Sequence, residues 1–286
     1  MSDKIYGIVT EKIIALLDKG VVPWHKPWKA SDAPRSLDGR AYNGINAWLL
    51  SAQASFCQYP LNIWGTFNTV KAHGGYVRRG EKSMPIVFWR GGKKNEEGET
   101  ITRPYMTYFS VFNVAQCDGL EIDEADTIPL GSIESADEIV TRYFARVTAP
   151  SLFYGGDCAS YSPARDSVSM PMPEGFDGSP EFYSTLFHEM AHSTGHKTRL
   201  AREGIVNHIN FGSHNYSKEE LVAEMSAAFL CGRSGIESTF ENSAAYIATW
   251  REKLTSDKHV IVSVASQADK AVRFITGELR EEQTEE

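Results

Sequence analysis

Hydrophobic residues recur with helical spacing from the start of the chain. Ile5, Val9, Ile13 and Leu16 follow one another at intervals of three or four residues, and Gly20 comes shortly after them. This spacing places the four side chains on one face of a helix, and glycine is a common stop signal. The first twenty residues therefore predict an amphipathic helix with one buried side.

A second strongly marked helix is predicted for residues 179–194. Ser179-Pro180-Glu181 supplies an N-cap, a proline at the first helical position and an acid in the first turn. Phe182, Leu186 and Met190 follow at intervals of four, which gives an apolar stripe for a core. Gly195 then ends the pattern.

The rest of the pattern mixes helices with short strands. Trp48 lies in an apolar helical run at 45–54, and Phe109, Val111 and Val114 alternate as in a strand, so we expect all four in a core. Such a mixture indicates the α+β class. Short strands are predicted at 151–154 and 167–172, and further helices at 135–147, 217–230, 244–254 and 260–274.

Charge divides the chain of 286 residues, whose net charge is −8. Residues 1–118 hold 15 Lys and Arg against 10 Asp and Glu, whereas residues 119–286 hold 14 against 27. The asymmetry suggests a nucleic-acid partner for the basic half. An acidic, turn-rich stretch separates the halves, so we predict a first domain at 1–118, a linker at 119–134 and a second domain at 135–286.

The spacing of the cysteines and the hydropathy of the chain indicate its cellular compartment. Cys57, Cys117, Cys158 and Cys231 are scattered, without a C-x-x-C pair, as expected for free thiols in a reducing cytoplasm. The first twenty residues do not have the pattern of a targeting segment. No apolar run approaches the roughly 18 residues that a membrane span needs, so we expect no membrane partner.

The predicted helix at 179–194 contains the run His188-Glu189-Met190-Ala191-His192. Residues i and i+4 share a helix face, so His188 and His192 can bind one ion at about 2.0–2.1 Å. Glu189 can act as general base toward a metal-bound water. Imidazole and carboxylate ligands suit Zn²⁺, which we expect, and also accept Mn²⁺.

A third protein ligand is expected downstream. Glu220 and Glu224 share one helix face in an E-x-x-A-E pattern, which resembles the E-x-x-A-D helix of several metallopeptidase families. The resemblance implies Glu220 as third ligand and Glu224 as an acid that hydrogen-bonds a ligand histidine. Ser217 and Glu220 also spell a capping box, in which case Glu224 becomes the ligand. His196 is a further alternative.

Aromatic and basic residues interleave in the first half, which holds five of the six tryptophans. Single-strand binders use cations to track phosphates and aromatic faces to stack on bases. The alternative to DNA binding is that these aromatic side chains are buried in the core of the domain, as aromatic residues usually are. The expected DNA-binding residues are Trp24, Lys26, Trp28, Lys71, Arg78, Arg79 and Lys82.

Several stretches along the chain match one family in order. They are Pro23–Trp28, Tyr42–Asn46, Trp64–Phe67, Gly74–Lys82, Phe112–Gln116, Leu186–His196 and Glu219–Glu224. With these stretches the chain resembles the ArdC-type antirestriction proteins, which join an ArdC-like domain that binds single-stranded DNA to a zincin-like metallopeptidase domain. The resemblance implies a mixed α/β first domain, a gluzincin-type second domain, and a plasmid-borne protein that protects conjugating DNA in the bacterial cytoplasm of the donor, and of the recipient if it enters with the DNA.

Three hypotheses for the function stay open. In the first, the protein is a DNA-activated peptidase acting on a restriction, repair or DNA-bound protein. In the second, it coats DNA while its metal site is structural, and in the third, its basic half binds an acidic protein. For the peptidase, we expect Tyr216 or His214 to stabilise the oxyanion. We also expect an extended substrate to pair with the strand at 167–172.

Overall fold

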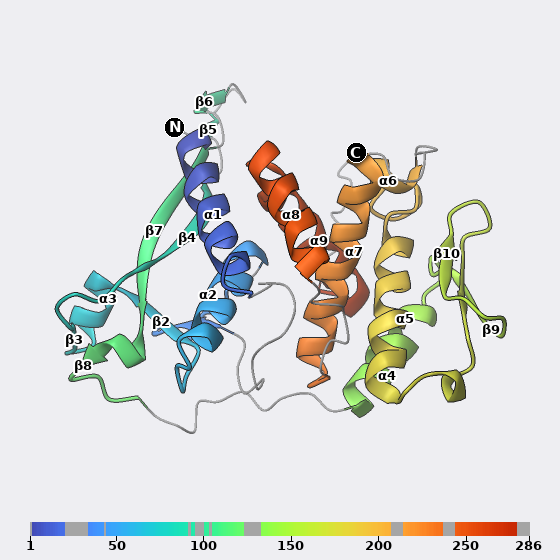
Figure 1. Ribbon diagram of the computed structural model, residues 1–286, viewed down its shortest axis with the longest axis horizontal. Coiled ribbons are helices and arrows are strands. Elements are labelled where there is room, and N and C mark those ends of the chain that lie inside the picture. Colours follow the sequence, from blue (N-terminus) through green and yellow to red (C-terminus); the bar gives the residue numbers. More distant parts are fainter. Residues whose placement is uncertain are drawn as a thin grey trace. The chain divides into compact units, whose positions relative to one another are not determined.

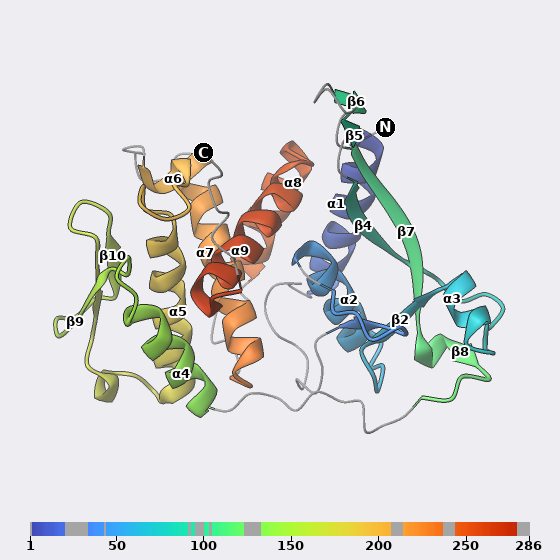
Figure 2. The ribbon, with the colours of Figure 1, turned by 180° about the vertical axis from the view of Figure 1, so that it is seen from behind.

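The computed structural model describes residues 2–20, 34–42, 44–90, 93–94, 100–102, 105–122, 133–206, 214–236 and 244–278. Trp24, Lys26 and Trp28 lie outside these ranges. The described elements fall into two compact units, each with both helices and strands (Figures 1 and 2). The predicted α+β class is therefore confirmed.

The first unit is built around a four-stranded sheet with the order β1-β2-β7-β4. β1 runs parallel to β2, and the other pairs are antiparallel, with Met84 opposite Val111 and Arg90 opposite Tyr105. Its elements are α1 (Ser2–Leu17), β1 (Arg35–Ser36), α2 (Gly44–Phe56), β2 (Ile63–Thr66), α3 (Phe67–Ala72), β3 (Tyr76–Val77), β4 (Met84–Arg90), β5 (Lys93–Lys94), β6 (Thr100–Thr102), β7 (Tyr105–Asn113), η1 (Val114–Gln116), β8 (Cys117–Asp118) and α8 (Ala244–Ser256).

Helices α1 and α2 cover one face of the long strands β4 and β7 (Figures 1 and 2). The apolar stripe of α1 is buried as predicted, and so is Trp48 of α2. Val111 and Val114 are buried too, but the prediction for Phe109 is wrong, because its side chain is 39% exposed. Alternating side chains along a strand lie on two opposite faces, but the alternation does not show how fully other elements cover each face.

The second unit packs helices against a three-stranded sheet with the order β10-β11-β9. Its core includes Phe187 and Met190 of α5 with Ala227 and Leu230 of α7. Its elements are α4 (Ile133–Phe144), β9 (Ser151–Tyr154), β10 (Ser160–Ser162), β11 (Ser167–Met170), η3 (Pro173–Gly175), α5 (Ser179–Thr194), α6 (Glu203–Val206), α7 (His214–Arg233) and α9 (Val260–Thr276).

Two details of this unit differ from expectation. The strand at 167–172 is β11, which pairs with β10 on one side and β9 on the other. Its backbone therefore forms hydrogen bonds to a strand on each side, and among the described strands of this sheet the edges are β9 and β10. Helix α8, expected within the domain at 135–286, instead groups with α1 in the first unit.

Within the described residues, no helix combines the length and the apolar character that crossing a membrane requires.

Candidate functional site

Helix α5 holds the two candidate histidines rigidly. Its N-cap lies one residue earlier than expected, because Gly178 with φ +129° is the N-cap and Ser179 is the first helical residue. Pro180 lies in the first turn, and Gly195 caps the end as predicted. Phe187 and Met190 are fully buried on either side of the His188–Glu189 pair in the sequence, so packing fixes the rotation of the helix about its axis.

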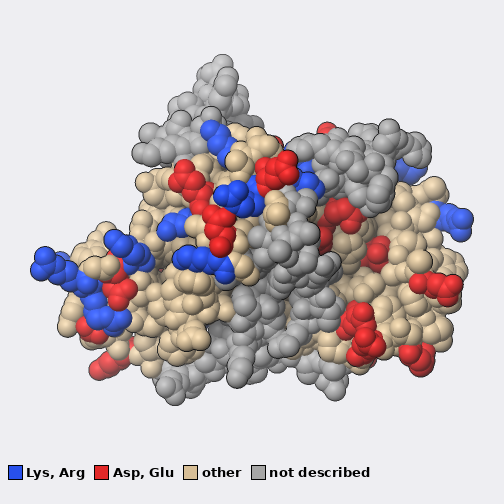
Figure 3. Space-filling model, in the orientation of Figure 1, with Lys and Arg blue, Asp and Glu red and all other residues tan. Residues whose placement is uncertain are grey.

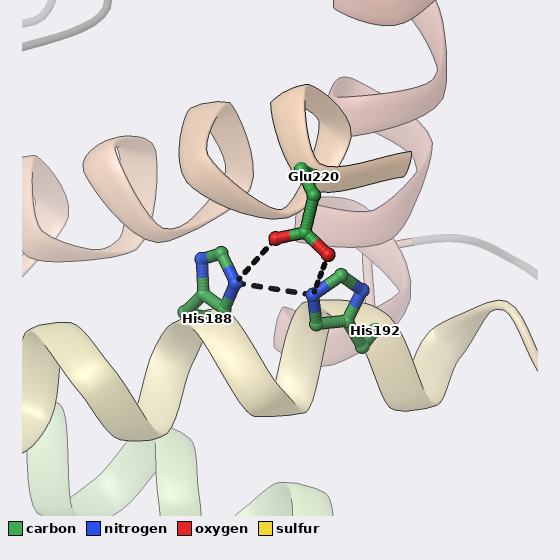
Figure 4. Close-up of side chains that lie close together, drawn as sticks. All are labelled: His188, His192 and Glu220. Atoms are coloured by element: carbon green, nitrogen blue, oxygen red, sulfur yellow. Dashed lines mark hydrogen bonds and ion pairs between the residues drawn. The ribbon is translucent and has the colours of Figure 1, made fainter. Parts of the chain in front are cut away.

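Helix α7 brings Glu220 to these histidines. Its buried residues Leu221, Val222 and Met225 pack in the same unit as α5, which it contacts along much of its length. Glu220 Oε2 lies 3.5 Å from His188 Nε2, and Glu220 Oε1 lies 3.7 Å from His192 Nε2. The two Nε2 atoms are 3.0 Å apart. The three side chains therefore converge on one point (Figure 4).

The donor set fits a divalent cation. Four-coordinate zinc with ligands at about 2.0–2.1 Å places those ligand atoms roughly 3.3 Å apart. The observed separations of 3.0, 3.5 and 3.7 Å are close to that spacing. Two ring nitrogens and a carboxylate facing one point are also the ligand types that Zn²⁺ and Mn²⁺ share.

The other expected site residues are placed differently. Glu189 is buried and lines a cavity of about 840 Å³ together with His192 and Glu220. Glu224 lies one turn beyond Glu220 and is not a member of the three-residue cluster. Tyr216 lies in the first turn of α7, and its side chain is outside the part of the structure that is described. The role of Glu224 as a supporting acid stays a prediction.

His196, the alternative ligand, also lines the cavity but does not belong to the cluster. Its Nδ1 lies 2.8 Å from the hydroxyl of Thr198 and 3.7 Å from Asp166. Asp166 is held in turn by the buried guanidinium of Arg199. His196 is thus directed toward the turn between β10 and β11.

Sequence reasoning missed two charged residues beside the cluster, Glu219 and Arg202. Glu219 Oε1 lies 3.3 Å from His192 Nδ1, and both oxygens of Glu219 accept hydrogen bonds from Arg202. Glu219 directly precedes Glu220, so the single sequence signal was a second acid at the start of the predicted helix. Arg202 lies in an irregular segment that carried no pattern.

Electrostatics follow from these contacts. Burial alone would lower the pKa of His192, but hydrogen bonds to Glu219 and Glu220 outweigh it and raise the pKa to about 10. Burial would raise the pKa of Glu220, but its contacts with His188 and His192 hold it far below its usual range. Burial likewise opposes, and Arg202 produces, the lowered pKa of Glu219. The contacts therefore favour the charged carboxylate form of both Glu219 and Glu220.

The described basic candidates of the first unit gather around α3, β3 and β8 (Figures 1 and 3). Lys71, Arg79 and Lys82 are exposed there. Arg78 is exposed as well, and it also donates to Asp118 at 3.2 Å, to Glu81 at 3.1 Å and to the carbonyl oxygen of Ala115 at 2.5 Å. Two large aromatic side chains lie in the same elements, Phe67 at 57% exposed and Tyr76 at 60%.

Two family models match the chain in order. Residues 3–112 match the N-terminal domain of the anti-restriction factor ArdC. Residues 136–267 match the zincin-like metallopeptidase. The second match includes α8, although that helix packs in the first unit.

Relatives match over nearly the whole chain. The uncharacterized protein y4eC of Sinorhizobium fredii (strain NBRC 101917 / NGR234) is 31% identical over 99% of this chain and 94% of its own length. Two DNA primase TraC proteins of Escherichia coli are 31% and 32% identical over 94% and 93% of this chain. This chain spans only 20% and 26% of their lengths.

Solved structures agree with these matches. The antirestriction ArdC protein from the R388 plasmid is 32% identical to this chain in its metal-free crystal structure, with a TM-score of 0.75 over 96% of this chain and 98% of that one. Its Mn(II)-bound structure is 31% identical, with a TM-score of 0.76 over 97% and 99%. With both domain models matched in order and such likeness across its length, the chain belongs to the ArdC antirestriction family.

Proposed function

We propose that this protein is an antirestriction factor that binds single-stranded DNA with its first unit and carries a metal-dependent peptidase centre in its second. The observation that carries the proposal is the convergence of His188, His192 and Glu220, with Glu189 lining the same cavity. The Mn(II)-bound ArdC structure supports a divalent ion for this site.

His188, His192 and Glu220 would hold the ion through two Nε2 atoms and a carboxylate. When bound, an ion such as Zn²⁺ or Mn²⁺ supplies Lewis acidity, which polarises a carbonyl oxygen and lowers the pKa of water. The Glu189 carboxylate takes the proton of the attacking water and passes it to the leaving amine. Strand β10 is an edge of its sheet and Ser160–Ser162 line the cavity, so an extended peptide would add to the sheet beside β10.

The exposed residues around α3 and β3 would form the DNA surface. Phe67 and Tyr76 offer aromatic faces for stacking, while Lys71, Arg79 and Lys82 offer cations for phosphates. Arg78 supports the turn that presents them. Trp24, Lys26 and Trp28 stay candidates from the sequence.

Plasmid-linked relatives support a role during conjugation, in the cytoplasm of the donor and of the recipient if the protein enters with the DNA. The peptidase substrate would be a host restriction component or another DNA-bound protein. The competing function is DNA coating with a structural metal site, which the exposed aromatic and basic surface alone would support.

A Glu189→Gln variant separates these functions, because it removes the base while keeping side-chain volume. We expect this variant to retain bound metal and to lose protection of transferred DNA in a conjugation assay with a restricting recipient. Glu174→Gln, which changes an exposed acid in the same unit, is the control and should protect normally. Full protection by Glu189→Gln would leave DNA coating as the function.

The DNA partner is tested by the affinity of the full chain for a labelled oligothymidylate across salt concentrations. Binding that weakens steeply with salt supports phosphate contacts. Absence of binding at low salt would instead favour an acidic protein as the partner of the basic unit.

A further inference from the structure

A buried ion pair, Arg202 with Glu219, lies next to the cluster of His188, His192 and Glu220. Arg202 and Glu219 are both buried, and their contact is bidentate: Arg202 Nε donates to Glu219 Oε2 at 2.9 Å and Nη2 to Oε1 at 2.5 Å. Glu219 Oε1 also lies 3.3 Å from His192 Nδ1. Both ring nitrogens of His192 therefore face specific partners, Nδ1 facing Glu219 and Nε2 facing the cluster.

Arg202 also fastens the end of the helix that carries His192. Its Nη1 donates to the hydroxyl of Thr194 at 2.6 Å, and its Nη2 donates to the carbonyl oxygen of Ala191 at 2.7 Å. A cation at a helix C-terminus also interacts favourably with the helix dipole. One guanidinium thus ties the end of α5 to the first described turns of α7.

Two glycines leave room for this arrangement. A Cβ on Gly204 would lie 2.8 Å from Glu219 Cβ and 3.1 Å from its Oε2. A Cβ on Gly195 would lie 3.0 Å from Arg202 Nη2 and 2.6 Å from Ile205. The backbone therefore approaches the ion pair more closely than any other residue type allows without displacing it.

We propose that Glu219 and Arg202 are positioning residues that fix the tautomer and orientation of His192 at the metal centre. This inference rests on the proposed metal-dependent function. A proton held on Nδ1 by Glu219 leaves the Nε2 lone pair free to bind an ion, and the carboxylate makes the ring a better donor. Arg202 occupies both Glu219 oxygens, which keeps this carboxylate from turning toward the ion beside Glu220.

The first test measures the Mn²⁺ affinity of the full chain by calorimetry in a double variant, Glu219→Met with Arg202→Met. The double change removes both buried charges together, so neither is left alone in the interior. We expect an affinity about 10–100-fold below wild type, as is typical when the outer partner of a ligand histidine is lost. The control is Arg233→Met with Glu278→Gln, which removes an exposed ion pair from the same unit and should bind normally.

The second test changes the space around the pair and leaves its charges in place. Gly204→Ala pushes against Glu219, and we expect weaker Mn²⁺ binding. Gly232→Ala lies in α7 with nothing within 4 Å of the added carbon, so it should leave affinity unchanged. Circular dichroism identifies variants that fold, and only these are compared.

The third test reads the wild-type protein directly. In a long-range proton–nitrogen spectrum of the Zn²⁺-loaded protein with labelled histidine, we expect His192 to carry its proton on Nδ1. A metal bound through Nδ1, or wild-type affinity in a folded double variant, would overturn the inference. Wild-type protein that binds neither Mn²⁺ nor Zn²⁺ would instead overturn the proposed metal centre, and the inference with it.

Discussion

The two units place their candidate functional residues in different ways. In the second, His188 and His192 are fixed by helix geometry, and Glu220 is brought to them by packing of α7 on α5. In the first, the adjacent residues Arg78 and Arg79 lie in one turn and both are exposed, yet Arg78 forms ion pairs with Glu81 and Asp118. A regular helix makes side-chain placement depend on spacing, whereas in a turn it depends on tertiary partners.

The largest effect should come from loosening the packing behind the metal centre. Phe187 is fully buried in α5 directly before His188, so Phe187→Ala should lower the free energy of unfolding by about 3–5 kcal/mol. Phe153→Ala, at a side chain 58% exposed in the same unit, should change it by less than about 0.5 kcal/mol. Urea denaturation followed by circular dichroism measures both. Equal effects would show that α5 is not held by its core.

The next effect separates the two acids of α7. Glu220→Gln should weaken Mn²⁺ binding by more than about 100-fold, because a direct ligand matters more than an outer partner. Glu224→Gln, which changes an acid outside the cluster, should have the smaller effect. Metal analysis after dialysis provides the measurement. Retained metal in Glu220→Gln would make Glu224 the third ligand.

A smaller effect is expected from the exposed aromatics of the first unit. Phe67→Ala should reduce affinity for oligothymidylate by about 1–3 kcal/mol if its ring stacks on a base. Fluorescence anisotropy measures the affinity, and Phe153→Ala provides an equally exposed aromatic control. The same loss in both variants would mean that these rings contribute no specific stacking.

The smallest effect concerns the pair of arginines. Arg79→Gln should lower the slope of log affinity against log salt by about 0.7, the loss of one contact to single-stranded phosphate. Arg78→Gln should instead lower the melting temperature, because it removes the contacts to Asp118, Glu81 and Ala115. Exchanged results would reverse the roles given to these neighbours.

Helical periodicity made α5 and α7 predictable, and the i, i+4 rule placed His188 and His192 on one face of α5. The choice between Glu220 and Glu224 needed the rotation of α7 against α5, which only packing determines. Arg202 was not predictable, because it follows the end of α5 in an irregular segment and its position depends on Glu219, seventeen residues later.

In the first unit, the sequence indicated a basic, aromatic domain but not its working surface. The alternating pattern of β7 put Phe109 in a core, although its side chain is 39% exposed. Arg78 matched the composition expected of a phosphate contact, yet Asp118, forty residues away, engages its guanidinium. Contacts at such sequence separations leave no local pattern to read.

The packing of α8 against α1 determines when the first unit can complete its fold during synthesis. Thr10 donates to the carbonyl oxygen of Lys258 at 2.9 Å, and Arg251 forms an ion pair with Asp18 at 2.6 Å. A ribosome must therefore synthesise most of the polypeptide before the first unit can close. A fragment ending in the acidic stretch would lack α8 and leave part of α1 open to water. The DNA affinity measured on such a fragment would therefore be that of an incompletely folded first unit.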